Sequence, residues 1–122
     1  MMKLLAIAAV GEALFGAVVL VYPPIVVRLL FGAEIGGVGV VMGRIAGISL
    51  IALGVACWPG GAADRALSAM LTWGTLITLY LGYLGVGGKW TGSLLWPAIV
   101  LHAGLTVLLA SAWFGERQAR VR

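Results

Sequence analysis

The chain has 122 residues, of which 62% are hydrophobic and only 10% are charged, and its net charge is +4. A soluble domain of this length carries roughly 25% charged residues, so the composition predicts a single integral membrane domain over residues 1–122. In a membrane protein the excess of Lys and Arg bears on orientation and on contact with anionic lipid, and it does not indicate a nucleic-acid partner. The single cysteine, Cys57, excludes an intramolecular disulfide and a two-cysteine redox or zinc site.

The first predicted span covers about 3–22, close to the roughly 20 apolar residues that cross about 30 Å of hydrocarbon. Lys3 precedes it as in a signal peptide, but Glu12 interrupts the apolar run and no small-residue cleavage pattern follows, so we expect a retained helix. Glu12 and Gly16 lie on one helical stripe at four-residue spacing, whose other members are small. We therefore expect this face to point into a helical bundle.

A short helix follows the first span, because Pro23 and Pro24 end one helix and Pro24 can begin the next. This helix is predicted over about 25–31 and ends at Gly32. About seven residues rise only about 10 Å, which is too little to cross the bilayer. We expect the helix to lie in the membrane interface, with Arg28 directed towards the headgroups.

The second predicted span, about 38–58, combines a flat face with a charge. Gly39, Gly43 and Gly47, at four-residue spacing, form a helix face where a neighbouring backbone can approach closely. Arg44 lies among these glycines, and a charge inside hydrocarbon is costly unless something compensates it. We therefore expect the rest of the chain to supply a close-packed neighbour and a partner for Arg44.

The third span is predicted over about 66–86. Small and hydroxylated residues form one stripe on it, which we expect to pack against other helices. The members of this stripe are Ser68, Thr72, Thr75, Thr78 and Gly82. Trp73 and Tyr80 lie on the opposite face, and we expect them to meet lipid or a second protomer.

The fourth span is predicted over about 93–114, and it carries His102 and Thr106 on a stripe of otherwise small residues. The basic tail, 115–122, is expected to be frayed or to lie on the membrane surface. The sequence thus predicts an all-α fold, a four-helix transmembrane bundle with a short interfacial helix between the first two spans.

Orientation follows from the cations outside the spans, because cytoplasmic segments carry the excess of Lys and Arg. The side that holds both termini has Lys3, Arg65, Arg117, Arg120 and Arg122, and the other side has Arg28 and Lys89. This bias predicts a protein of the plasma (inner) membrane with its N- and C-termini in the cytoplasm.

Three ionisable residues are expected to meet inside the bundle. A rise of about 1.5 Å per residue places Glu12, Arg44 and His102 in the outer half of the membrane or at its midplane, with Thr78 at a similar depth. We predict an ion pair between Glu12 and Arg44, with His102 close by. The pair has two open interpretations: a buried polar lock that fixes helix register, or a chamber that opens outward. Such a chamber would bind an anionic headgroup or metabolite, or pass protons.

Catalysis and metal binding are not indicated. His102 has no second strong ligand in the chain, so no metal or cofactor is expected. We expect a non-catalytic membrane protein that self-assembles into a homo-oligomer or serves as an accessory subunit of a larger membrane complex. The alternative is a small carrier, or a protein that binds a lipid or a small-molecule metabolite through Arg44, Glu12 and His102.

The order of these segments resembles that of the DoxX-like group of small bacterial four-helix membrane proteins. The shared layout is a first span, a proline-started short helix from Pro23 to Gly32, and three further spans. It covers most of the chain, and it implies a fold without implying an activity. Glu12 in a first span is also similar to the small multidrug resistance exporters, but Arg44 would repel the cations that such a site binds.

Overall fold

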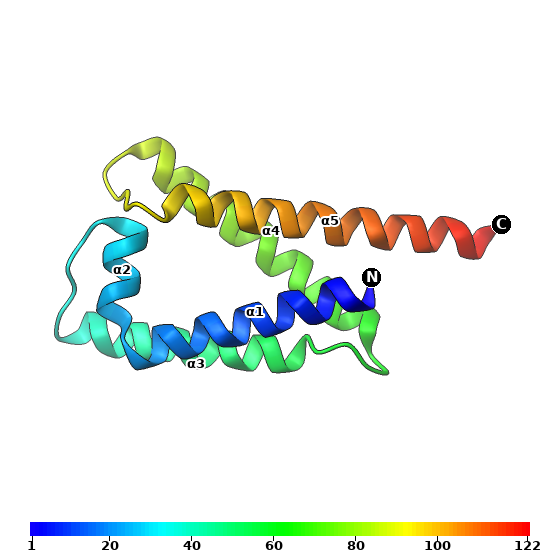
Figure 1. Cartoon of the computed structure of the whole chain (residues 1–122), viewed down its shortest axis with the longest axis horizontal. Helices are drawn as coiled ribbons and strands as arrows, with labels where there is room; N and C mark the ends of the chain where they lie inside the picture. Colours follow the sequence, from blue (N-terminus) through cyan, green and yellow to red (C-terminus); the bar gives the residue numbers. More distant parts are fainter.

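The computed structural model describes residues 1–122, and all of its regular structure is helical (Figure 1). The helices are α1 (Met2–Val21), α2 (Pro23–Phe31), α3 (Val38–Ala56), α4 (Ala63–Gly87) and α5 (Leu95–Val121). All except α2 are long and apolar enough to cross a membrane, which indicates a membrane protein. The prediction of an all-α chain with four long apolar helices and one short helix is confirmed.

Several helix ends differ from the prediction, and α4 begins at Ala63, three residues before the predicted start. α2 begins at Pro23, two residues before the predicted range of 25–31, because the first helical position needs no N–H donor. α5 continues to Val121, so the tail is helical and the first alternative, a frayed tail, is wrong, whereas its position on the membrane surface stays a prediction. Arg117 stacks 4.1 Å from the Trp113 ring, and Glu116 lies 3.4 Å from the N-terminal amine. These contacts hold the helix together beyond the apolar segment.

α1 and α3 form the closest helix pair. A Cβ atom added to Gly16 would lie 2.7 Å from the Gly47 carbonyl oxygen, and one added to Gly54 would lie 2.5 Å from the Ala9 carbonyl oxygen. No real side chain fits at these distances, so the two backbones touch directly. This is the packing mode that small residues make available to membrane helices.

α4 and α5 form a second antiparallel hairpin, in which α4 crosses the molecule obliquely towards the α1–α3 pair (Figure 1). Gly74 of α4 packs against the side chain of Thr106 of α5, and Gly85 packs against the ring of Trp96. α3 has little contact with α4 or α5, so α1 carries most of the packing between the long helices of the two hairpins.

The two hairpins are joined at both ends. Near the chain termini they share one apolar cluster, which contains Leu5, Ala8, Ala9, Cys57, Ala66, Leu67, Met70 and Leu109. At the other end α2 bridges them, because the backbone N–H groups of Gly92 and Leu94 donate to the Leu30 and Leu29 carbonyls at 2.8 and 2.9 Å. A polar site lies between these two junctions.

Candidate functional site

A single buried carboxylate forms the centre of the site. Glu12 of α1 is only 7% exposed, and it is the one charged side chain in the core. Its Oε1 accepts a hydrogen bond from the indole Nε1 of Trp73 on α4 at 2.8 Å. The same oxygen lies 3.8 Å from Nδ1 of His102 on α5. Glu12 therefore connects α1 to both helices of the other hairpin.

The second oxygen of this carboxylate, Oε2, is buried and has no hydrogen-bond partner among the protein groups. A cavity of about 10 Å³ adjoins Glu12, and its polar lining includes His102 and Thr106. A volume of about this size holds one water molecule when two or more polar groups surround it. The cavity is too small for a metabolite or a lipid headgroup.

Local packing explains why these side chains converge. Gly74 lets α5 come close enough for Thr106 to contact the α4 backbone, and His102 lies one helical turn before Thr106. On α1, Ala8 lines the same cavity one turn before Glu12. Small neighbours on both sides thus make room for one large polar cluster.

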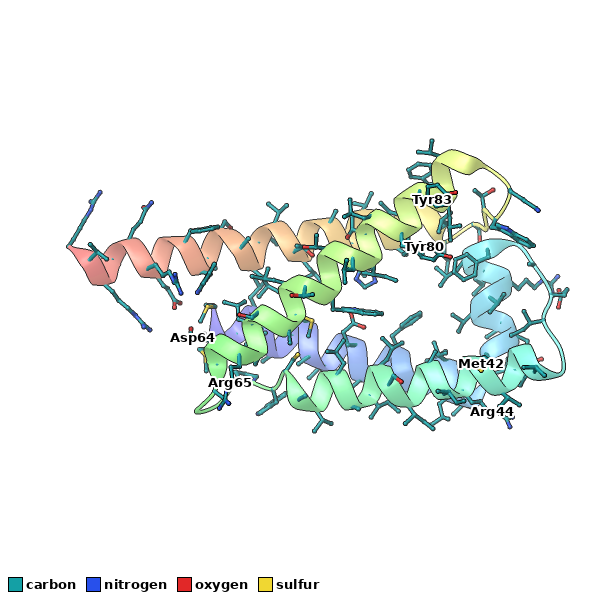
Figure 2. The ribbon with its side chains drawn as sticks, turned by 180° about the vertical axis from the view of Figure 1, so that it is seen from behind. Met42, Arg44, Asp64, Arg65, Tyr80 and Tyr83 are labelled. Carbon is teal, nitrogen blue, oxygen red and sulfur yellow. The ribbon has the colours of Figure 1, made fainter.

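The predicted ion pair between Glu12 and Arg44 is absent. Arg44 forms no salt bridge, its side chain is exposed, and Figure 2 shows it at the outside of the molecule. The helix register explains this. Glu12 lies between Gly16 and Ala9, which face Gly47 and Gly54, so it is about 10 Å along the helix axis from Arg44. Glu12 also turns towards α4 and α5, whereas Arg44 lies outside the α1–α3 contact.

The predicted orientation of Trp73 is also wrong, because its indole points inward to Glu12. The inner face of α4 is formed by apolar residues such as Met70, Gly74 and Leu81. The hydroxylated stripe does not pack inside the chain: Ser68, Thr72 and Thr75 are exposed. The hydroxyls of Ser68 and Thr72 donate to carbonyls one turn earlier in α4, so they need no partner on another helix.

The sequence contains a pattern from which the inward orientation of Trp73 could have been predicted. An indole N–H inside an apolar span needs an acceptor, and Glu12 is the one carboxylate in the interior of a predicted span. The apolar spacing of Met70, Gly74 and Leu81 places Trp73 beside the inner face rather than opposite to it. Together these two facts connect α1 to α4.

The remaining predicted residues lie around the site or apart from it. Thr78 is half-buried and donates its hydroxyl to the Gly74 carbonyl at 2.6 Å, but it does not line the cavity. A Cβ atom on Gly43 would lie 2.6 Å from Cβ of Pro23, so this glycine packs against the start of α2. Gly39 approaches only Ile35, in the segment just before α3.

A second, open pocket of about 390 Å³ lies at the end of the molecule that holds both termini. Its charged lining mixes both signs, with Asp64 and Arg65 from the start of α4, which Figure 2 shows, Glu116 and Arg120 from α5, and the N-terminal amine of Met1, which lies 3.4 Å from Glu116. A lining in which positive and negative groups stand side by side does not favour a ligand of either charge, so we do not place the functional site there.

Comparison of the chain with protein-family models, with curated proteins and with solved structures found no match. The resemblance to the DoxX-like group therefore stays a prediction.

Proposed function

We propose that the chain is a non-catalytic integral membrane protein of the plasma (inner) membrane, which self-assembles or serves as an accessory subunit of a membrane complex. In this proposal Glu12 is a polar lock that holds the α1–α3 pair against the α4–α5 hairpin. The observation that carries the proposal is the hydrogen bond of 2.8 Å from Trp73 to Glu12. It joins α1 of one hairpin to α4 of the other, beside the apolar cluster that these two helices share.

The energy of such a lock supports this role. A hydrogen bond to a charged group contributes about 1.5–3 kcal/mol. Removing the indole donor leaves the buried carboxylate oxygen without that hydrogen bond, which costs about 1–3 kcal/mol. Hydrophobic burial does not drive helices together inside lipid, so one polar contact of this kind selects which faces of the two hairpins meet.

The proposed orientation, with both termini in the cytoplasm, is supported by where the cations lie. Lys3, Arg65 and the arginines of the α5 tail belong to the end of the molecule that holds both termini (Figure 1). Arg28 and Lys89 belong to the end with α2 and the α4–α5 loop. Cations concentrate on the cytoplasmic side of membrane proteins.

A double-mutant cycle between Glu12 and Trp73 tests the lock. Glu12→Leu and Trp73→Phe each remove one partner of the hydrogen bond, and thermal unfolding in mild detergent measures the loss of stability. We expect the double variant to be more stable than the sum of the two losses implies, with a coupling of about 1–3 kcal/mol. Strictly additive losses would contradict the lock. Trp96→Phe is the matched control, because Trp96 makes no side-chain hydrogen bond and should show no coupling to Glu12.

One observation favours a second candidate, a carrier that exchanges protons. Oε2 of Glu12 is buried without a hydrogen-bond partner, and Glu12 and His102 both line the same water-sized cavity. Proton flux into proteoliposomes tests this function: a carrier would lose its flux in Glu12→Gln and keep it in Thr78→Val. A wild-type protein that shows no flux above empty liposomes would exclude this candidate and leave the lock standing.

A further inference from the structure

Arg44 lies on the outer surface of α3, among apolar side chains. Its apolar neighbours on α3, Val41, Ile45 and Ile48, are each about half exposed, at 55%, 51% and 55%. Figure 2 shows Arg44 on the side of α3 that faces away from the other long helices. In a membrane this stripe faces acyl chains, so the guanidinium lies against lipid and not in a protein interior.

The position of Arg44 along α3 sets its depth. α3 begins at Val38, so the Cα atom of Arg44 lies about 9 Å from the end of the helix that faces α2. A charge at this depth is costly, and long Arg side chains reduce the cost by extending towards the interface. The guanidinium therefore reaches the level of the headgroups on the α2 side, where it needs an anion.

The chain itself offers no free carboxylate for that purpose. Glu12 is buried against Trp73 and His102, and Glu34 lies 3.5 Å from Arg28. The two other acids, Asp64 and Glu116, belong to the end that holds the termini. A second copy inserted in the same orientation has the same arrangement, so it supplies no free acid at the level of Arg44 either.

We propose that Arg44 binds the phosphate of a phospholipid in the leaflet on the α2 side, with the acyl chains lying along Val41, Ile45 and Ile48. This inference rests on the membrane insertion in the proposed function, and it does not depend on the lock at Glu12. A guanidinium donates two parallel hydrogen bonds to a phosphate, which makes arginine the preferred residue for this contact. An anionic phospholipid without a competing ammonium group is the favoured ligand.

Arg28 provides the matched control. It lies at the same end of the molecule, its side chain is 72% exposed, and it is already paired with Glu34. If the lipid were attracted only by general positive charge, loss of Arg28 and loss of Arg44 would have similar effects. If the phosphate binds at Arg44, only the second loss should matter.

The test measures retained lipid by native mass spectrometry on the full chain, released from nanodiscs that contain phosphatidylglycerol and phosphatidylcholine. We expect the wild-type protein to retain phosphatidylglycerol. Arg44→Gln should retain at least about 10-fold less of this lipid, because the variant loses a charge-assisted hydrogen bond. Arg28→Gln should stay within about twofold of wild type, and Arg44→Lys should retain an intermediate amount. Inorganic phosphate in the buffer should not displace the lipid.

Three results would overturn the inference. The first is equal retention in wild type and Arg44→Gln, and the second is an equal loss in Arg28→Gln and Arg44→Gln. The third is a dimer that forms in wild type and dissociates in Arg44→Gln without any change in retained lipid, which would assign Arg44 to a protein partner.

Resistance of each variant to alkaline extraction from membranes is measured alongside. If the wild-type chain is extracted like a soluble protein, the proposed membrane function is overturned as well. If the chain stays in the membrane and Arg44→Gln retains as much lipid as wild type, only the Arg44 site is overturned.

Discussion

Glu12 on α1 and Arg44 on α3 are both charged residues inside apolar helices, and the molecule accommodates them in opposite ways. Glu12 is buried and has partners on two other helices, whereas Arg44 is exposed and has no partner in the chain. The two residues differ in what their helices contact. α1 lies next to every other helix, but α3 packs mainly against α1. A charge on a central helix is compensated by the protein, and a charge on a peripheral helix is compensated by what surrounds the protein.

Charge reversal at the two positions should separate them most clearly. Glu12→Lys places an ammonium group beside the Trp73 N–H in the core, where no carboxylate compensates its charge, so we expect a loss of about 3–5 kcal/mol in stability. Arg44→Glu exchanges one exposed charge for another, and it should cost less than about 1 kcal/mol in detergent. Thermal unfolding of both variants measures the contrast. Equal destabilisation would mean that Arg44 has a structural partner within the fold.

The glycine contact between α1 and α3 allows a second contrast. A Cβ atom on Gly47 would lie 2.5 Å from the Leu20 backbone nitrogen, so Gly47→Ala should destabilise the chain by about 1–3 kcal/mol. Gly82 of α4 has open space around it. Gly82→Ala should therefore stabilise by up to about 1 kcal/mol, since alanine is the better helix former. A Gly47→Ala variant as stable as wild type would show that the two backbones do not touch.

The two partners of Glu12, Trp73 and His102, should contribute unequally to the stability of the fold. Trp73 donates at 2.8 Å, but His102 lies 3.8 Å away, which is too long for a direct hydrogen bond. We expect Trp73→Phe to cost about 1–3 kcal/mol and His102→Leu to cost less than that. Chemical denaturation in detergent gives both values. A larger loss of stability in His102→Leu than in Trp73→Phe would show that the main partner of Glu12 is on α5 and not on α4.

The smallest expected effect belongs to Arg44→Gln. Removing an unpaired charge from an apolar surface should leave thermal stability in detergent within about 0.5 kcal/mol of wild type. Its effect should be on retained lipid alone. A clear loss of stability without lipid would indicate a contact inside the protein that the account of Arg44 does not include.

Much of the architecture could be predicted from the sequence, because span length, prolines and composition act along one helix at a time. The four long helices, the short α2 and the approach of Gly16 and Gly47 all follow from such local patterns. The partners of Glu12 do not, since they depend on how far each helix is rotated and shifted against its neighbours. α4 carries two competing faces, one hydroxylated and one built on Met70 and Gly74, and the apolar face is the buried one.

The pairing of Glu12 with Arg44 failed for a similar reason. Depth estimates from helical rise place the two residues within a few residues of the same level, and opposite charges then suggest a contact. The contact faces of α1 and α3 are fixed instead by Gly16, Gly47 and Gly54, which shift Arg44 along the helix and turn it outward. Charge alone does not determine register where backbones can approach this closely.

NMR of the indole N–H groups in ¹⁵N-labelled protein tests most directly whether the Trp73 indole donates a hydrogen bond to Glu12. We predict that the Trp73 signal lies downfield and exchanges slowly with water, and that Glu12→Leu shifts it. The signals of Trp58 and Trp90, which are exposed, should stay where they are. A Trp73 signal that exchanges as fast as those two, or that ignores the loss of Glu12, would contradict the polar lock.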